Sequence, residues 1–123
     1  IPNVLASVGK PDLSTTVFGK KIDMPLFLSP TAMQRLYHHD GDKASARAAE
    51  KFGTFYSMST MANNTIEEIA EISKGPKLFQ LYVHKDQSIT DDLIERCRIS
   101  GYDGMCLTVD LSLIHISEPT RRS

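Results

Sequence analysis

Apolar residues recur in four short runs along the chain, at residues 24–29, 54–59, 77–83 and 105–110. Each run has the length of a buried strand rather than that of a helix. Because side chains alternate along a strand, Gln80 and Tyr82 share one face of the third run, and Thr108 and Asp110 share one face of the fourth. The pattern therefore predicts four buried strands that become polar at their carboxyl ends.

Helical patterns separate these strands. The first predicted helix covers residues 42–52 and ends before Gly53. Its predicted apolar face consists of Ala44, Ala48, Ala49 and Phe52. The second helix begins at Thr65, which forms a capping box with Glu68, and it ends at Gly75.

The third predicted helix begins at Ser88 or Thr90 and ends at Ser100. Asp91 and Asp92 are expected in its first turn, where acidic side chains suit the helix dipole. The residues expected to face inward are Ile89, Leu93, Ile94 and Cys97.

Strands that alternate with helices predict an α/β fold with a parallel sheet. Before the first of these strands, residues 15–23 form two short strand-like pieces around Gly19-Lys20, which predicts a hairpin. An amide beside a phenol, as at Gln80 and Tyr82, is also explained by pairing with neighbouring protein groups. The recurrence of polar strand ends favours instead one ligand site above a common layer.

Size and charge restrict the class of protein. The chain has 123 residues and a net charge of -1, which suits one modest domain and gives no reason to expect nucleic acid or an anionic membrane as a partner. No apolar run approaches the ~18 residues of a membrane span, and residue 1 does not open a signal-peptide pattern. Cys97 and Cys106 have no metal-type spacing and are expected to be unpaired. We therefore expect a cytoplasmic protein.

Residues 111–123 break the strand-helix pattern. The run Leu-Ser-Leu-Ile-His-Ile-Ser-Glu-Pro-Thr-Arg is what translation gives for the transposase adapter used in sequencing libraries. We expect this segment to be a sequencing artefact, with residues 1–110 as the natural domain. A short natural tail is the alternative.

The four strand ends resemble those of FMN-dependent α-hydroxy-acid dehydrogenases and oxidases. The motifs are Ser-Pro-Thr-Ala-Met at 29–33, Ser-Met-Ser-Thr-Met at 57–61, Phe-Gln-Leu-Tyr-Val at 79–83 and Leu-Thr-Val-Asp at 107–110. The resemblance covers about residues 12–110 and implies a partial TIM (β/α)8 barrel, with strands one to four and an N-terminal hairpin.

The resemblance also implies roles for particular residues. The backbone at Pro30, Thr31 and Ala32 would line the flavin of FMN. The side chains implied to hydrogen-bond the polar edge of the flavin ring are Ser59, Gln80 and Thr108. Tyr82 would lie on the substrate side, and Asp110 would orient a histidine base, so these two are the catalytic candidates.

Met61 occupies the position where glycolate-type members of the family carry tryptophan and many lactate-type members carry leucine or methionine. We therefore expect a small, lactate-like L-2-hydroxy acid as the substrate, although plain packing also explains a methionine. The resemblance further implies a homo-oligomeric whole enzyme without a metal. It leaves open a peripheral membrane contact through a later loop.

The family's base histidine, substrate arginines and phosphate-binding loops lie beyond the fourth strand. We therefore expect the 123-residue chain by itself to be inactive. Two alternatives remain: another FMN-binding barrel enzyme, or a non-enzymatic half-barrel that associates with itself.

Other polar clusters have simpler explanations. The run His38-His39-Asp40 has no partner at metal-ligand spacing, so we expect a loop and helix-capping role for it and no metal. The acidic pairs at Glu67-Glu68 and Asp91-Asp92 are expected in first helical turns.

Overall fold

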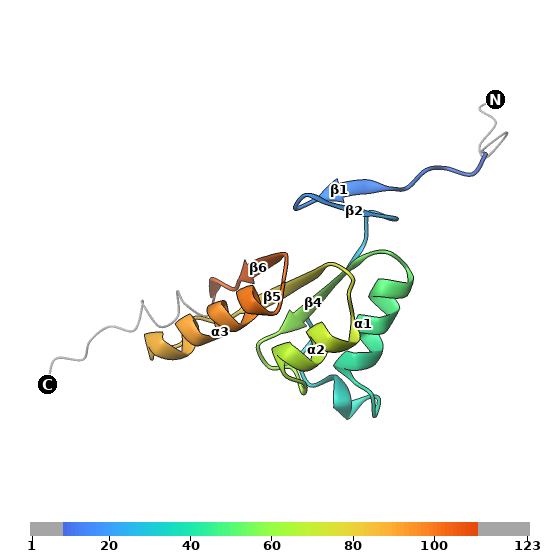
Figure 1. Ribbon diagram of the computed structural model, residues 1–123. Helices are drawn as coiled ribbons and strands as arrows, with labels where there is room; N and C mark the ends of the chain where they lie inside the picture. Colours follow the sequence, from blue (N-terminus) through green and yellow to red (C-terminus); the bar gives the residue numbers. More distant parts are fainter. Residues whose placement is uncertain (1–8, 111–123) are drawn as a thin grey trace, which may run out of the picture.

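The computed structural model describes residues 9–110 of the chain. Four parallel strands form one sheet in the order β3-β4-β5-β6. Their bounds are Phe27–Leu28 for β3, Phe55–Ser59 for β4, Lys77–Leu81 for β5 and Gly104–Leu107 for β6. The helices α1 (Asp42–Lys51), α2 (Ile66–Ile72) and α3 (Gln87–Ile99) connect them and lie on one side of the sheet (Figure 1). The predicted α/β fold is confirmed.

Only the two central strands are buried along their whole length. Every residue of β4 and β5 is buried, whereas three of the four residues of β6 are exposed. On the other side, Phe27 of β3 is exposed. The prediction of four buried strands is therefore wrong for the outer two, because each has a neighbouring strand on only one side within residues 9–110.

The strands are also shorter than predicted. Residues 24–29 contribute only Phe27–Leu28, since Pro25 has no N–H and the amide of Leu26 donates to the carbonyl of Met24 (2.8 Å) in a tight turn. The strands β5 and β6 end at Leu81 and Leu107. Tyr82, Thr108 and Asp110 therefore follow the strands instead of ending them.

The main core lies between the sheet and the helices. Its largest members are the rings of Tyr56 and Phe79, and Ile66 and Ile69 of α2 pack beside them. The capping box of α2 is confirmed: the Glu68 amide donates to the Thr65 hydroxyl (3.2 Å), and the Thr65 amide donates to the Glu68 carboxylate (2.9 Å).

The helix α1 buries only part of the predicted face, since Ala49 is buried as predicted and Ala44 is partly buried. Ala46 and Ala49 are buried, whereas Ala48 is exposed and Phe52 is 58% exposed. Ala48 and Phe52 line an apolar hollow beside β3 that nothing within residues 9–110 fills. Gly41 is the N-cap residue and makes no side-chain cap, so the expected capping role of the 38–40 run is wrong.

The helix α3 begins earlier than predicted. Asp86 is its N-cap and accepts from the Ser88 amide (3.0 Å), so Asp91 and Asp92 lie beyond the first turn. Of the residues expected to face inward, Cys97 is buried, but Ile89 and Ile94 are 43% and 41% exposed because they flank the buried stripe.

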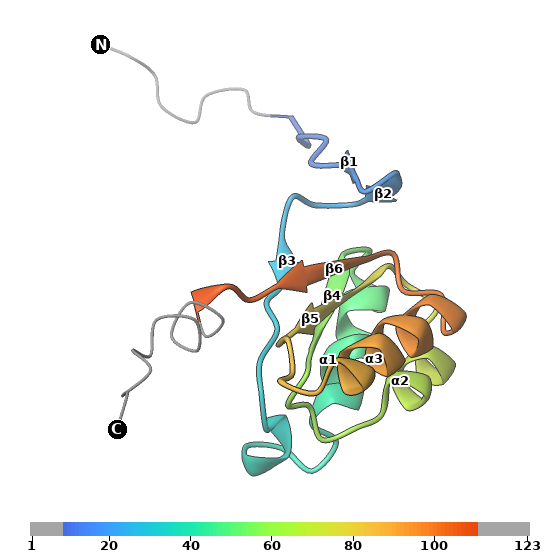
Figure 2. The same cartoon turned by 90° about the vertical axis from the view of Figure 1, so that its left-hand side faces the viewer.

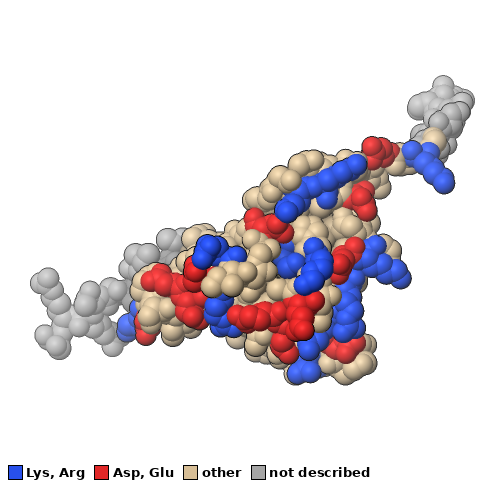
Figure 3. Space-filling view, in the orientation of Figure 1, with Lys and Arg blue, Asp and Glu red and all other residues tan. Residues whose placement is uncertain are grey.

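The polar side of the helices is covered by mixed charges (Figure 3). Arg96 of α3 forms a two-pronged ion pair with Glu67 of α2 (2.7 Å for both bonds) and lies 3.5 Å from Asp92. This pairing joins α2 to α3 at the surface.

The predicted hairpin is present as β1 (Thr15–Val17) and β2 (Lys20–Ile22). Its two-residue turn is Phe18-Gly19, both with positive φ, rather than the expected Gly19-Lys20. The hairpin lies beyond the amino ends of the sheet strands (Figure 2). There, Ile22 packs against Phe55 and Leu78, which leaves the carboxyl ends uncovered by the hairpin.

Candidate active site

Three polar side chains from successive strand ends form a connected cluster. The Gln80 amide oxygen accepts from the Ser59 hydroxyl (3.3 Å), and the Gln80 amide nitrogen donates to the Thr108 hydroxyl (2.7 Å). Ser59 and Gln80 are buried and Thr108 is partly buried. The structure thus brings together the three side chains predicted to hold the flavin edge; we call them the strand-end cluster.

The strand-end cluster retains hydrogen-bonding capacity. Within residues 9–110, Gln80 uses one of its two N–H groups, and the Thr108 hydroxyl accepts one bond and donates none. The Ser59 hydroxyl donates to Gln80 and accepts from the Met61 amide (3.1 Å), which leaves it one lone pair. Two donors, from Gln80 and Thr108, and two acceptor lone pairs, one each on Thr108 and Ser59, are therefore available to a ligand, and none of the three groups is charged.

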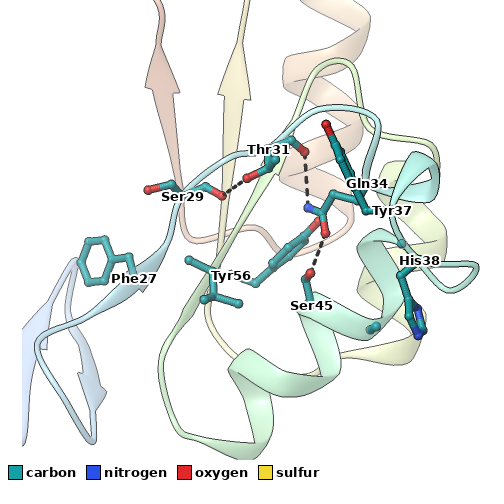
Figure 4. A pocket seen from close by; sticks show the side chains of 11 residues that line it. Phe27, Ser29, Thr31, Gln34, Tyr37, His38, Ser45 and Tyr56 are labelled. Carbon is teal, nitrogen blue, oxygen red and sulfur yellow. Dashed lines mark hydrogen bonds between the residues drawn. The ribbon is translucent and has the colours of Figure 1, made fainter.

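The loop after β3 carries the predicted flavin-lining backbone. Pro30 and Thr31 are exposed and Ala32 is partly buried. Gln34 ties this loop to α1, since its amide nitrogen donates to the Thr31 carbonyl (3.3 Å) and its amide oxygen accepts from the Ser45 hydroxyl (2.5 Å) (Figure 4).

The loops after β3 and β4 are joined to each other. The amide of Met33 donates to the carbonyl of Met61 (3.2 Å), and Met33 adopts a left-handed backbone with φ of 52°. The Met61 side chain is 49% exposed at this junction. Met61, predicted to contact substrate, therefore lies on a loop bonded directly to the predicted flavin loop.

Tyr82 is the first residue after β5 and is partly buried. Its amide donates to the hydroxyl of Thr60 (3.2 Å). Asp110 is exposed and is the last described residue, two positions beyond Thr108. The predicted roles of Tyr82 and Asp110 toward a substrate and a base stay predictions.

Thr60 was not among the predicted site residues, although it contacts Gln80 as well as Tyr82. Strict alternation places Thr60 on the face opposite Ser59, but β4 ends at Ser59 and the alternation ends with it. No pattern in the sequence marks that change.

Asp42 was also missed. Its carboxylate is fully buried and accepts from the Tyr56 hydroxyl (3.2 Å) and from the Asn63 amide (2.9 Å). Burial, and then the negative charge of Asp42, raise the pKa of Tyr56 far above its usual value. Tyr56 therefore stays protonated and acts as a hydrogen-bond donor.

A cavity of about 400 Å³ lies behind the loop after β3 (Figure 4). Phe27, Tyr37 and Tyr56 are among its lining residues, and no member of the strand-end cluster lines it. The cavity is thus separate from the strand-end cluster, which remains the candidate site.

Histidine and acidic side chains do not gather into a metal site within residues 9–110. His38 instead accepts from the Asp40 amide through Nδ1 (3.2 Å), and Asp40 pairs with Arg47 (3.4 Å). Among the described helices, none is both long and apolar enough to cross a membrane.

Comparison with known proteins adds to this geometry. The model of the family described as FMN-dependent dehydrogenase matches residues 1–123. Glycolate oxidase 1 of Zea mays is 44% identical over 109 residues, which cover 89% of this chain and 30% of the relative. L-lactate oxidase of Nostoc sp. is 40% identical over 126 residues, which cover 99% of this chain and 34% of the relative.

A solved structure is similar as well. The crystal structure of a lactate oxidase from Pediococcus acidilactici superposes with a TM-score of 0.82 and 32% identity, covering 89% of this chain and 31% of that one. The chain spans about a third of the length of the curated relatives it matches (30% and 34%). The resemblance first seen at the four strand ends is confirmed, and the chain belongs to the FMN-dependent dehydrogenase family, a family of enzymes whose cofactor is FMN.

Proposed function

We propose that residues 12–110 form the first four strands, with the three helices between them, of an eight-stranded, FMN-dependent barrel that oxidises a small L-2-hydroxy acid to the 2-keto acid. The observation that carries this proposal is the strand-end cluster, a connected set of neutral side chains at the carboxyl ends of three adjacent parallel strands. Ligands bind at that end of parallel α/β barrels.

The available groups of the cluster fit FMN. The edge of the flavin ring presents uncharged donors and acceptors, and the cluster offers uncharged donors from Gln80 and Thr108 and an acceptor at Ser59. When bound, FMN accepts the two electrons that the hydroxy acid loses. The backbone at Pro30, Thr31 and Ala32 would then lie against the ring.

The remaining candidates would act on the substrate. The phenol of Tyr82 would hydrogen-bond the carboxylate or hydroxyl of the hydroxy acid, and Asp110 would orient a histidine base supplied by a segment that follows these four strands. The substrate would lose its α-hydrogen and its hydroxyl proton. Because the site candidates within residues 9–110 do not include that base, we expect the 123-residue chain alone to show no turnover.

Met61 supports a lactate-like substrate over glycolate. Its side chain is half exposed on the loop that bonds to the flavin loop, where it would shape the space around the substrate's side group. The similar proteins include both glycolate and L-lactate oxidases, so the preference rests on Met61.

The test is a completed barrel, in which residues 12–110 replace the matching segment of Zea mays glycolate oxidase 1. We expect this protein to bind FMN and to oxidise L-2-hydroxy acids, with a higher kcat/KM for lactate than for glycolate. FMN binding is measured by quenching of flavin fluorescence and turnover by formation of the keto acid.

The cluster is tested in the same protein by Gln80→Leu, which removes the central amide while keeping similar volume. We expect FMN affinity to fall at least about tenfold, since buried hydroxyls lose their partner. The matched control is Gln87→Leu, an exposed glutamine of α3 that bonds only to Asp91 among the described residues. If Gln80→Leu binds FMN as the control does, the proposed flavin role of the cluster is wrong.

Self-association of the half-barrel is the second candidate, and the two outer strands favour it. Leu26 beside β3 and Leu107 in β6 are 57% and 56% exposed, and both outer strands lack a partner on one side within residues 9–110. Gel filtration of the 123-residue chain separates the outcomes. A discrete dimer supports the half-barrel, whereas material in the void volume contradicts it.

A further inference from the structure

One hydroxyl group bridges the ends of β4 and β5. The Thr60 hydroxyl donates to the carbonyl of Gln80 (2.5 Å) and accepts from the amide of Tyr82 (3.2 Å). The Thr60 amide adds a bond to the Gln80 side-chain oxygen (3.2 Å). A single partly buried residue thus contacts the main chain and side chain of Gln80 and the main chain of Tyr82.

These contacts take the place of main-chain hydrogen bonds that the β4–β5 ladder would make if β4 continued beyond Ser59. The last paired residues of β4 and β5 are Ser59 and Gln80, and β4 has no further strand residue to continue the ladder. The Gln80 carbonyl and the Tyr82 amide face that side, because groups two residues apart point the same way along a strand. A threonine hydroxyl has a donor and acceptors, so it satisfies both groups at once.

The opposite edge of β5 is held differently. There the Thr108 amide donates to the carbonyl of Leu81 (3.0 Å) by an ordinary main-chain bond. Tyr82 therefore leaves the strand from a segment with main-chain support on the β6 side and side-chain support from Thr60 on the β4 side. Of these two supports, only the one from Thr60 depends on a side chain, so a substitution can remove it.

We propose that Thr60 is a positioning residue that sets Gln80 against the flavin and Tyr82 against the substrate through these two hydroxyl bonds. The inference rests on the proposed function for its consequences in the reaction, but the contact itself is independent of that function. Thr60 acts through Gln80 and Tyr82.

Two substitutions of Thr60 separate the role of its hydroxyl from that of its shape. Thr60→Val keeps the shape of the side chain and removes both hydroxyl bonds, whereas Thr60→Ser keeps the hydroxyl and removes the methyl group. A purely space-filling role predicts that Val is tolerated and Ser is harmful. A positioning role through the hydroxyl predicts the reverse.

The first measurement is amide hydrogen exchange of the 123-residue chain. We expect Thr60→Val to speed exchange at Tyr82 about tenfold or more, because its amide loses its acceptor. Exchange at Thr108, whose amide bonds to Leu81, should stay within about twofold, and Thr60→Ser should resemble the parent at both sites. Equal acceleration at Tyr82 and Thr108 would show a general loss of stability and would overturn the proposal.

The second measurement uses the completed barrel. We expect Thr60→Val to weaken FMN binding about tenfold and to lower kcat by more than it raises KM, with Thr60→Ser within about twofold of the parent. Unchanged FMN affinity and kcat in Thr60→Val would overturn the positioning role. If the completed barrel with Thr60 intact binds no FMN, the proposed function fails, while hydrogen exchange still decides whether Thr60 holds Tyr82.

Discussion

The phenol of Tyr56 donates a hydrogen bond to the carboxylate of Asp42 (3.2 Å) at a place where both side chains are almost wholly buried, with 1% and 0% exposed. The same carboxylate accepts from the amide of Asn63 (2.9 Å) in the loop after β4. Asp42 begins α1, so this one group ties a helix, a central strand and the loop that carries Met61.

The first prediction concerns this buried pair. Asp42→Asn replaces one carboxylate oxygen by an amide nitrogen, which cannot accept a hydrogen bond. Either the buried Tyr56 hydroxyl or the part-buried Asn63 amide therefore loses its acceptor. We expect the free energy of unfolding in urea to fall by about 2 kcal/mol, within the range for a bond to a charged group. Tyr56→Phe should cost about 1 kcal/mol, and the double variant less than the sum, because the two changes share a contact.

The control for this pair is Asp40→Asn. Asp40 lies two residues away but is partly exposed and pairs with Arg47 at 3.4 Å at the surface. We expect a change within about 0.5 kcal/mol, as for other surface ion pairs. A comparable loss in Asp40→Asn would mean that charge near the start of α1, and not the buried contact, sets the effect.

The second prediction concerns alkaline pH. Burial raises the pKa of the Cys97 thiol from 9.0 to about 12, and burial raises the pKa values of Tyr56 and Tyr102 above their usual range as well. The unfolded chain therefore releases these protons before the folded chain does. The folded chain is fully stabilised by these protonated groups below pH 9. As the pH rises further, its free energy of unfolding falls by up to about 1.4 kcal/mol per pH unit for each proton.

Urea unfolding between pH 7.5 and 10.5 tests this. The onset of the decline should lie near pH 9 in the parent and move to about pH 10, where the tyrosines begin, in Cys97→Ala. Cys106→Ala is the matched control, since Cys106 is exposed. If the free energy of unfolding still begins to fall near pH 9 in Cys97→Ala, groups other than Cys97 cause the decline.

Much of the candidate site was predictable because it lies where two simple patterns meet. Alternation along the runs placed Ser59, Gln80 and Thr108 at neighbouring strand ends, and a parallel sheet brings such ends together. The capping box at Thr65 and the hairpin were predictable for the same reason, since each depends on residues a few positions apart.

The missed features depend on neighbours that are distant in sequence. Alternation cannot tell a central strand from an outer one, so β6 was expected to be buried although three of its residues are exposed. An aspartate at the start of a helix usually faces water, and only the position of Tyr56 makes Asp42 a buried acceptor. Thr60 was missed because β4 ends one residue before it.

The third prediction compares two glycines with positive φ. Gly53 (φ +63°) follows α1, and a Cβ there would overlap the carboxylate of Asp23, whereas a Cβ on Gly101 (φ +73°) would have no heavy atom within 4 Å. We expect Gly101→Ala to cost about 1 kcal/mol from its backbone alone. Gly53→Ala should cost about 2 kcal/mol or more, because the overlap adds to the same strain.

The excess cost at Gly53 has a direct test in urea unfolding. Asp23→Ala removes the carboxylate but keeps the bond from the Asp23 amide to the Gly53 carbonyl (2.8 Å). In that background, most of the excess cost of Gly53→Ala over Gly101→Ala should disappear, because only the Cβ of residue 23, 3.0 Å from the added group, still crowds it. If the excess persists in full, the overlap with the Asp23 carboxylate does not explain it.

The last prediction concerns substrate preference in the completed barrel. The main chain at Met61 is held at both ends, because its amide donates to Ser59 (3.1 Å) and its carbonyl accepts from Met33 (3.2 Å). A change of side chain at this position should therefore alter the space beside the substrate without moving the loop. Met61→Trp should lower kcat/KM for lactate relative to glycolate about tenfold, since one methyl group in a tight pocket is worth that much. Met61→Leu, which nearly conserves volume, should leave the ratio within about twofold. An unchanged ratio in Met61→Trp, with FMN still bound, would show that this side chain does not face the substrate and would remove the basis for choosing lactate.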